Sequence, residues 1–379
     1  MTINPQRKDY SINLSKLTHS IEKGLQSLLR LQKRDGHYVF ELEADCTIPA
    51  EYILLRYYRG ETVDSVLENK ISTYLRRQQN SDGGWPLFYD GPSNISASVK
   101  AYFALKMIGE PIDSDSMLRA RQWILSKGGA SQSNVFTRNL LALYTIIPWT
   151  GVPVMPVEIM HLPRWFPFHL EKISYWARTV LVPLTVLNAL KPVPRSSKSI
   201  KLDELFLISP TREKNWPSGP IHIFPWTLIF KYLDLILRYV EPWFPKSSRK
   251  SAIKKALHFV NERLNGEDGL GGIFPAMFNS VLMYDALGYP SDHPHLKTAR
   301  HSIDNLLIVK EREAYCQPCL SPVWDTALVA HTLMEVGSDE AHVSASQCTE
   351  WLKSKQILDI KGDWASKRPQ LKPGGWAFQ

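Results

Sequence analysis

A short pattern that recurs along the chain limits the possible folds more than any other feature of the sequence. In each copy a Leu is followed after three residues by a Gln and then, after a spacer, by a Gly, one further residue and an aromatic residue. Internal repeats of this kind indicate a fold built from repeated supersecondary units. The three full copies have as key residues Gln32, Gly36 and Tyr38; Gln79, Gly83 and Trp85; and Gln356, Gly362 and Trp364.

The pattern describes the end of a helix and the turn that follows it. Leu17, Ile21, Leu25 and Leu28 precede the first Gln at helical spacing, which predicts an amphipathic helix. The Gln amide can satisfy free backbone groups at helix ends, and Gly permits a left-handed turn. A second helix is predicted at residues 95–108. We therefore expect an all-α fold of repeated helix pairs, in a solenoid or a ring, although any single copy could be an ordinary glycine-capped helix end.

The charge distribution argues against nucleic-acid binding. The formal net charge is +8, but the Lys and Arg residues are scattered and form no tract interleaved with aromatic residues.

No apolar run reaches the ~18 residues that a membrane-spanning helix needs. The chain has four cysteines and its first residues contain no apolar signal segment, so we expect a reducing, cytosolic setting.

One short motif, the Cys316-x-x-Cys319 pair, is a candidate metal or redox site. A second Cys pair at zinc spacing is absent, and no βαβ pattern supports a thioredoxin-like site. His293 and His295 are close in sequence but lie in a Pro-containing loop. We therefore expect no metal and no cofactor.

Several segments besides the repeat resemble the squalene–hopene cyclase and oxidosqualene cyclase family. The resemblance covers residues 17–379, and the segments follow the family's order. They include AEYILLRYYRGE (50–61), SYWARTVLVPL (174–184), CLSPVWDTALVAHTL (319–333) and GDWASKRPQLKPGGWAFQ (362–379). The resemblance implies two α/α-toroid domains of the terpenoid cyclase and protein prenyltransferase type. It also implies an isomerase that cyclises squalene to hopene or hopanol in hopanoid biosynthesis.

The resemblance also implies a domain organisation. Residues 1–16 form an arm, residues 17–315 form the N-terminal toroid with a membrane-facing insertion near 221–245, and residues 316–379 begin an incomplete C-terminal catalytic toroid. The family's Asp-x-Asp-Asp acid motif follows a GGWAFQ-type segment, and this motif does not occur in the 379 residues. We therefore expect a fragment that ends before the protonating acid and does not cyclise squalene alone.

Two other functions stay open at this point. The chain could be a non-catalytic lipid-binding protein or the complementing half of a split cyclase, and a neighbouring reading frame with the acid motif would favour that interpretation. A protein prenyltransferase-like toroid would need Asp, Cys and His zinc ligands and a helical partner subunit. One bound zinc would favour this third function.

By resemblance, four aromatic residues belong to the wall of the cyclisation cavity. Trp176 is expected near the last rings to form, Trp324 near the end where the cascade begins, Phe378 beside an early ring cation, and Phe136 in the pocket wall. Aromatic faces stabilise cations through their quadrupole, most strongly in a dry site. For each of the four, a place in the protein core is the alternative interpretation.

Two carboxylates are candidate polar groups of the same cavity. Glu51 matches a family carboxylate that helps to hold water near the final cation, and Asp325 could hydrogen-bond in the cavity wall. Lys100, Asn134 and Phe274 stand where the family has other members of this water network, so the choice between alkene and alcohol stays open. A helix-start carboxylate is the alternative for Glu51, and a helix cap is the alternative for Asp325.

The stretch at residues 221–245 is the most apolar of the chain. Its charged residues recur at a spacing of three or four, which places them on one stripe of a helix next to an apolar face. The charges are Lys231, Asp234, Arg238 and Glu241, and the apolar face has Trp226, Ile229, Phe230, Leu233 and Leu237. This pattern is typical of a helix that lies in a bilayer surface, and a buried helix is the alternative.

The resemblance favours the bilayer interpretation, because members of the family are monotopic. We therefore expect squalene as the substrate and membrane lipid as a partner, at the cytoplasmic face of a membrane. A second copy of the chain, or a separately supplied C-terminal half, is the candidate protein partner.

Overall fold

The computed structural model describes residues 13–196, 198–217, 226–266, 268–359, 362–366 and 368–377. The chain divides into two compact units, one of residues 42–319 and one that combines residues 1–41 with residues 320–379. Residues 17–41, which we assigned to the N-terminal domain from the sequence, thus share a unit with residues 320–379. The predicted domain boundaries at residues 16 and 315 stay predictions.

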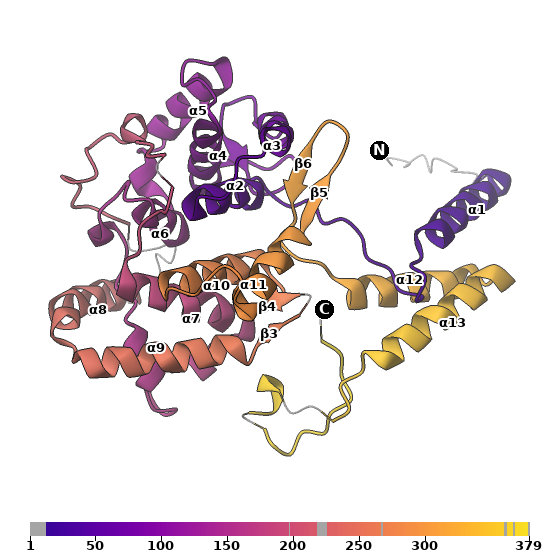
Figure 1. The fold of residues 1–379 in the computed structure, drawn as a ribbon. Coiled ribbons are helices and arrows are strands. Elements are labelled where there is room, and N and C mark those ends of the chain that lie inside the picture. The colour runs from indigo at the N-terminus through magenta and orange to yellow at the C-terminus, as the bar shows by residue number, and fades with distance from the viewer. Residues whose placement is uncertain are drawn as a thin grey trace, which may run out of the picture. The chain divides into compact units, whose positions relative to one another are not determined.

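Helices dominate both units, which confirms the predicted all-α class (Figure 1). The unit of residues 42–319 contains α2 (Thr47–Arg59), α3 (Ser65–Arg77), α4 (Ile95–Ile108), α5 (Asp115–Ser126), α6 (Val135–Leu143), α7 (Tyr175–Leu190), α8 (Trp226–Val240), α9 (Lys246–Asn261), α10 (Phe274–Ala286) and α11 (Pro294–Asp304). Its strands form short antiparallel hairpins: β1 (Trp85–Pro86) with β2 (Ser93–Asn94), β3 (Leu264–Asn265) with β4 (Gly269–Leu270), and β5 (Leu307–Val309) with β6 (Ala314–Cys316).

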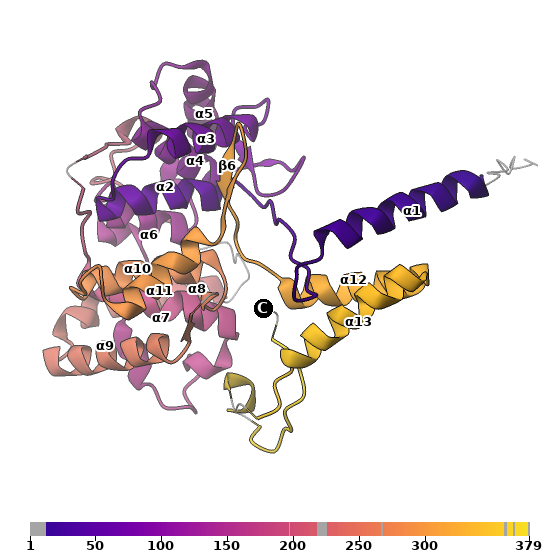
Figure 2. The same cartoon turned by 45° about the vertical axis from the view of Figure 1, so that its right-hand side comes forward.

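The other unit contains α1 (Leu14–Leu31), α12 (Pro322–Val336) and α13 (Asp339–Ser354). Helices α12 and α13 lie side by side, and α1 packs on both (Figure 2). The core of this unit includes Leu25, Tyr38, Leu333 and Cys348. Of the apolar face predicted for the first helix, Leu25 is buried and Leu28 is half-buried, whereas Leu17 and Ile21 are exposed.

Within residues 42–319, α2, α4, α6, α7 and α10 form an inner ring. Helix α2 contacts α4, α4 contacts α6, α7 contacts α10, and α10 contacts α2. The Asn188 amide of α7 donates to the Asn139 side chain of α6 at 3.0 Å, which closes the ring. Helices α3, α5, α9 and α11 pack outside these inner helices. This arrangement of inner and outer helices is the repeated helix pairing that the sequence predicts.

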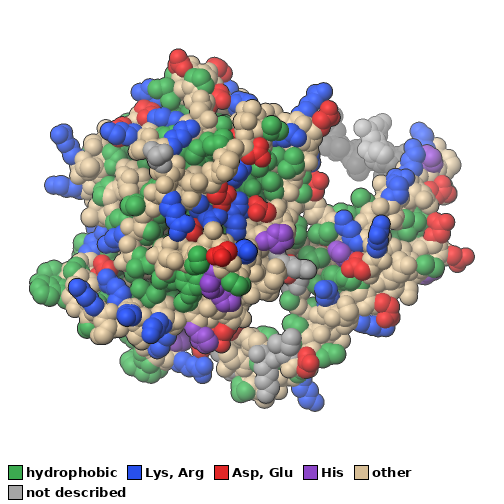
Figure 3. All heavy atoms as spheres, in the orientation of Figure 1, with side chains coloured by type: hydrophobic (Ala, Val, Ile, Leu, Met, Phe, Trp, Pro, Cys, Tyr) green, Lys and Arg blue, Asp and Glu red, His purple; other side chains and the backbone are tan. Residues whose placement is uncertain are grey.

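Ion pairs join inner helices to one another and to an outer helix. Arg59 of α2 pairs with Asp285 of α10 at 2.7 Å, and Arg300 of α11 pairs with Glu61 at 2.9 Å. Burial alone would raise the pKa of Glu61, but the hydrogen bonds and charge of Arg300, and the charge of Arg59, lower it below its usual range. Acidic and basic side chains accordingly gather over α2, α10 and α11 in Figure 3.

The turn of the second repeat copy shows what its key residues do. The Gln79 side-chain amide donates to the Gly83 carbonyl and to the Ser116 carbonyl of α5, each at 2.8 Å. Gly83 has a φ of 93°, in the left-handed region that favours glycine. Trp85 is fully buried, and its Nε1 donates to the Leu75 carbonyl at 2.7 Å. The Gln therefore ties its own turn to the start of the next helix.

The first repeat copy, in the other unit, makes equivalent contacts. The Gln32 amide donates to the Gly36 carbonyl at 3.0 Å and to the Ser344 carbonyl of α13 at 3.1 Å. Gly36 has a φ of 95°. Tyr38 is fully buried, and its hydroxyl lies 3.3 Å from that of Ser344. The same residue types thus hold a helix pair together in each unit.

The third copy uses residues that differ from those we assigned from the sequence. The Gln356 amide donates to the Gly374 carbonyl at 2.7 Å, and Gly374 has a φ of 138°. Trp376 Nε1 donates to the Leu352 carbonyl at 2.6 Å, four residues before the Gln, as Trp85 does in the second copy.

Gly362 and Trp364, the predicted members of this copy, are therefore replaced by Gly374 and Trp376. The sequence offers two Gly-x-Trp choices after Gln356, and the prediction took the nearer one. The spacer between Gln and Gly can lengthen because closing a longer loop adds little free energy, so the hydrogen bonds fix the ends and not the distance along the chain.

Helix α8 packs against the protein through its polar side. Asp234 accepts from the Val154 amide at 2.8 Å, and Arg238 donates to Asp234 and to the Val152 carbonyl, each at 2.8 Å. Asp234 and Arg238 of the predicted charged stripe are therefore turned toward the protein, whereas Lys231 is exposed.

An apolar face of α8 points outward instead, and we call it the α8 apolar face. It comprises Leu228, Tyr232, Leu235, Ile236 and Tyr239, with Trp243 just after the helix, and all six are exposed. Of the apolar face predicted from the sequence, Ile229 and Phe230 are exposed, Leu233 and Leu237 are half-buried, and the side chain of Trp226 lies outside the described part. Hydrophobic side chains project where α8 leads into α9, at the left edge of Figure 3. Among the described residues, no helix is both long and apolar enough to cross a membrane.

Candidate functional site

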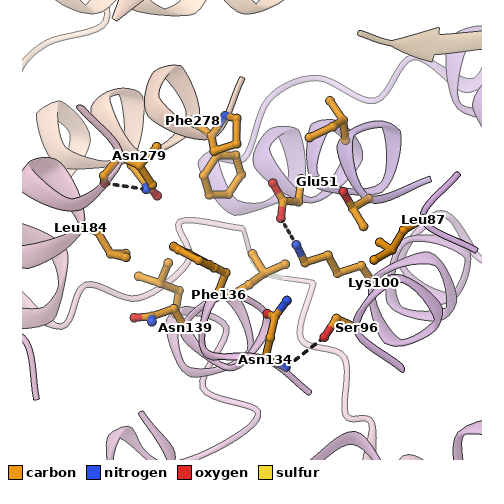
Figure 4. Close-up of a pocket in the computed structure, with 16 residues that line it drawn as sticks. Glu51, Leu87, Ser96, Lys100, Asn134, Phe136, Asn139, Leu184, Phe278 and Asn279 are labelled. Atoms are coloured by element: carbon orange, nitrogen blue, oxygen red, sulfur yellow. Dashed lines mark hydrogen bonds and ion pairs between the residues drawn. The ribbon is translucent and has the colours of Figure 1, made fainter. Parts of the chain in front are cut away.

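The inner ring encloses a pocket of about 290 Å³ (Figure 4). Every inner helix contributes side chains to it, and most of them are apolar. The lining residues are Thr47, Ile48, Glu51, Leu87, Ser96, Lys100, Asn134, Phe136, Asn139, Leu140, Leu143, Val180, Leu184, Pro275, Phe278 and Asn279. A concave, mainly apolar pocket with a few polar groups is the usual form of a small-molecule site.

The lining residues come from the N-terminal halves of several inner helices. Thr47 and Glu51 lie in the first turns of α2, Ser96 in the first turn of α4, and Pro275 in the first turn of α10. Helix N-termini carry a partial positive charge, so this end of the ring favours a negative group. Glu51 supplies such a group.

Glu51 forms an ion pair with Lys100 across the pocket. Lys100 Nζ lies 2.5 Å from Glu51 Oε1, and the two side chains are 8% and 12% exposed, respectively. Figure 4 shows Lys100 reaching from α4 toward Glu51 on α2. Because a buried charge without a partner is strongly unfavourable, each of the two residues makes the other tolerable in the pocket.

The Asn side chains of the pocket serve to hold the helices. Asn134 caps α6 by accepting from the Thr137 amide at 2.9 Å, and Asn279 donates to the Val180 carbonyl of α7 at 3.2 Å. Asn139 forms the ring-closing bond to Asn188. The polar lining is thus largely engaged in hydrogen bonds, which leaves the Glu51–Lys100 pair as its charged element.

The Cys316-x-x-Cys319 pair and the His residues form no metal site in the described part of the chain. No group of three His, Cys, Asp or Glu residues is arranged there to hold an ion. Cys316 is buried, and burial raises the pKa of its thiol well above the usual range, so the thiolate that binds metals is disfavoured.

Comparison with known proteins identifies the family. The squalene-hopene cyclase N-terminal domain matches residues 21–312, and the squalene-hopene cyclase C-terminal domain matches residues 320–379. The chain belongs to the squalene–hopene cyclase family. Membership of this family agrees with the ring of paired helices and confirms the predicted α/α-toroid class.

Curated squalene–hopene cyclases are similar over most of this chain. The squalene–hopene cyclase of Bradyrhizobium diazoefficiens is 57% identical over 96% of the chain and 55% of its own length. That of Zymomonas mobilis is 57% identical over 95% of the chain and 55% of its own length. A probable squalene–hopene cyclase of Sinorhizobium fredii is 54% identical over 97% of the chain. The chain thus spans about half the length of these relatives.

The structure brings two of the predicted site residues together in the pocket. Phe136 lies on α6 and is half-exposed, and Glu51 faces the same cavity from α2 (Figure 4). Trp176 lies on α7 one turn before Val180 and two turns before Leu184, which both line the pocket. Trp176 itself is 48% exposed and does not line the pocket. The functional roles of these residues stay predictions.

The remaining predicted site residues lie in the other unit. Trp324 is 57% exposed at the start of α12. Asp325 accepts from the Phe40 amide at 2.9 Å and from the Ser321 hydroxyl at 3.1 Å. These bonds connect the segment after α1 with the start of α12, which favours a structural role for Asp325. It is not the predicted helix cap, because α12 begins at Pro322 and Asp325 lies inside its first turn. Phe378 lies outside the described residues.

Sequence reasoning missed the contribution of α10 and the pairing of Lys100. Pro275, Phe278 and Asn279 line the pocket at a helical spacing that is visible in the segment FPAMFNS. Lys100 was noted only as a departure from the family's water network. The ion pair between Lys100 and Glu51 could not be predicted from the sequence, because the two residues lie on different helices of the ring.

Proposed function

We propose that this chain takes part in the cyclisation of squalene to hopene or hopanol, and that the inner-ring pocket receives one end of the polyene. Its curated relatives are named squalene–hopene cyclases. The observation that carries this proposal is the pocket itself. Its apolar wall includes Phe136 and Phe278, and Glu51 and Lys100 form a single charged pair in it. This combination suits a hydrocarbon whose reaction passes through carbocations.

The lining explains how a carbocation could survive there. Aromatic faces attract cations, most strongly where water is excluded. Phe136 and Phe278 line the pocket. The Asn134 amide oxygen, which would be the nucleophilic atom of this side chain, already accepts from the Thr137 amide. A carboxylate such as Glu51 can accept the proton that ends the reaction.

The activity test uses squalene as the substrate. The expected result follows because the Asp-x-Asp-Asp motif does not occur in these 379 residues. We expect purified 1–379 to form no hopene or hopanol, measured by gas chromatography. We expect turnover when the chain is fused to the C-terminal remainder of the Zymomonas mobilis relative. In that fusion, Phe136→Ala should lower kcat roughly tenfold or more through loss of cation stabilisation.

The matched control is Tyr89→Ala, because Tyr89 is 95% exposed and does not line the pocket. This variant should keep the activity of the fusion. Hopene from 1–379 alone would show that these residues contain a proton donor. An active fusion that tolerates Phe136→Ala would place the reaction outside the pocket.

The α8 apolar face supports a second part of the proposal, that the protein docks on a bilayer surface. The polar side of α8 is fixed to the Val152–Val154 segment, so the exposed apolar side is held outward in a defined orientation. A helix with aromatic and aliphatic residues on one side suits the boundary between headgroups and acyl chains. The net charge of +8 would favour anionic lipid on the cytoplasmic leaflet.

For docking, we expect the double substitution Ile236→Glu with Tyr239→Glu to lower vesicle binding at least about tenfold. Burial of a large apolar side chain contributes about 1.5–3 kcal/mol, and both contributions are lost. Flotation of the purified chain with vesicles of phosphatidylcholine and phosphatidylglycerol measures this. The control pair, Val63→Glu with Val66→Glu, changes exposed apolar residues of the same unit and should bind as the wild type does. Equal loss in both variants would point to a general charge effect.

A further inference from the structure

Helix α9 carries a row of lysines that the proposed function does not use. Lys246, Lys250 and Lys254 are exposed and follow one another at a spacing of four residues, so they lie along one side of the helix. We call these three residues the α9 lysine stripe. Ala252 and Ala256 are buried on the packed side of α9. The stripe therefore faces away from the protein.

The α9 lysine stripe is electrostatically unfavourable for the protein on its own. Like charges four residues apart on a helix repel each other, and Lys246 stands at the helix start, where the helix dipole disfavours a cation. Helix α9 contains no Asp or Glu. Within the part of the chain that the structure describes, no acidic side chain pairs with any of the three lysines. A negatively charged partner would relieve these repulsions.

The start of α9 is fixed in place beside the end of α8. Arg249 pairs with Glu241, in the turn between the two helices, at 3.1 Å. Arg249 also pairs with Glu158 at 3.0 Å, and His161 Nε2 lies 3.1 Å from the Ser248 carbonyl oxygen. These contacts hold the stripe in a defined orientation next to the α8 apolar face.

The stripe and the α8 apolar face together suit an anionic bilayer. The stripe begins three residues after Trp243, which is 78% exposed. Figure 3 shows Lys and Arg side chains over α9 next to the hydrophobic side chains at the left edge. A lysine has an apolar stem and a charged tip, so its ammonium group can lie among headgroups while neighbouring apolar side chains enter the acyl region. Apolar and cationic side chains arranged in this way are typical of helices on anionic membranes.

We propose that the α9 lysine stripe binds the phosphate groups of anionic phospholipids, next to the place where the α8 apolar face enters the bilayer. This inference rests on the docking part of the proposed function and adds the lipid class and the residues that select it. Each Lys close to an anionic surface strengthens binding about fivefold, and the effect falls off within a Debye length. The preference for anionic lipid therefore belongs to the stripe and not to the net charge of +8 as a whole.

The test compares two kinds of vesicle, one of phosphatidylcholine alone and one of phosphatidylcholine mixed with phosphatidylglycerol. Flotation of the purified chain gives the Kd for each, and the ratio of the two Kd values measures the preference for anionic lipid. In the triple variant Lys246→Gln, Lys250→Gln, Lys254→Gln this ratio should fall at least about tenfold, with binding to phosphatidylcholine within about twofold of wild type. Raising the salt from about 0.1 M to about 1 M should lower the wild-type ratio in the same way, because it shortens the Debye length.

Two controls accompany the triple variant. Arg at all three stripe positions keeps the charges and should keep the wild-type ratio. The variant Lys127→Gln, Lys214→Gln, Lys297→Gln removes the same amount of charge from exposed positions of the same unit and should keep most of the preference.

The outcomes separate this inference from the proposed function. If the stripe variant keeps the wild-type ratio, or if both Gln variants lose it equally, the stripe does not select the lipid and the inference is overturned. A wild type without preference for anionic vesicles also overturns it, as does a stripe variant that loses binding only to a single-stranded RNA. In each of these cases docking through α8 stands. If wild type binds neither vesicle, the docking part of the proposed function is wrong, and this inference is wrong with it.

Discussion

The Gln79→Glu variant is expected to lose about 3 kcal/mol or more of its free energy of unfolding. The substitution keeps the shape of the side chain but replaces the amide nitrogen, which donates to the carbonyls of Gly83 and Ser116, by an oxygen. A carboxylate there loses both hydrogen bonds and faces two carbonyl oxygens, and unsatisfied buried groups cost about 1–3 kcal/mol each, more when charged. Urea denaturation followed by circular dichroism measures the loss.

The pH dependence of this variant tests the explanation. Two carbonyl oxygens and partial burial disfavour the ionised form of the new carboxyl group. Arg119, which donates to Gln79 Oε1 at 3.2 Å, favours it, but Asp115 lies 3.0 Å from Arg119 and offsets its charge. We therefore expect the pKa of the new carboxyl group to be higher in the folded than in the unfolded state. The destabilisation should therefore be greatest at neutral pH and should shrink as the pH falls, because the protonated acid can donate to one carbonyl again. A deficit that does not change between pH 7 and pH 4 would contradict this account.

The matched control is Gln122→Glu, the same change at an exposed position of α5. This variant should stay within about 0.5 kcal/mol of the wild type, as most surface substitutions do. Similar losses in Gln79→Glu and Gln122→Glu would mean that added charge, and not the repeat turn, destabilises the protein.

The repeat turn also shows how far the sequence predicts the fold. Helix pairing and two of the Gln-to-Gly turns follow from local chemistry, because the residues that bond are four positions apart in each. The third turn joins Gln356 to Gly374, which lie 18 positions apart. No local rule selects Gly374 over Gly362. The choice is visible only in the hydrogen bonds of the folded protein, from Gln356 to the Gly374 carbonyl and from Trp376 to the Leu352 carbonyl.

The sequence predicted those pocket residues that lie in segments resembling the family. It did not predict the neighbouring residues that line the pocket with them. Glu51 and Phe136 were singled out from the sequence and share the pocket. Phe278 and Asn279 were not, because a helix that is buried on nearly all sides shows no distinct face in its sequence pattern. The inward turn of the α8 charges was missed for a related reason. The carbonyl and amide that Arg238 and Asp234 bind belong to a loop some 80 residues earlier in the chain.

A second large effect is expected for Arg138→Met, which should lower the free energy of unfolding by about 3 kcal/mol. Arg138 is 1% exposed on α6 and donates to the carbonyls of Gly151, at 2.7 Å, and Pro217, at 2.5 Å. Burial, and next the charge of Arg238, lower the pKa of Arg138 to about 10, so it stays charged at neutral pH. Met fills a similar volume but leaves two carbonyls without this donor, each at a cost of about 1–3 kcal/mol.

The loss should be concentrated between α6 and α8. The loop after Gly151 is held on its other side by α8, through the Val152 carbonyl and the Val154 amide. Freeing Gly151 should therefore loosen the Val154 amide, and its hydrogen exchange should become faster by a larger factor than that of α10 amides. Arg138→Lys, which can reach one carbonyl but not bridge two, should fall between the wild type and Arg138→Met.

Arg212→Met provides the control, since Arg212 is exposed in a loop of the same unit and should change the stability by less than about 0.5 kcal/mol. Because α8 carries the proposed membrane face, the Arg138 substitution should also weaken vesicle binding without altering any residue of that face. A variant that loses stability but binds vesicles as tightly as the wild type would show that the orientation of α8 does not depend on the Arg138 bridge.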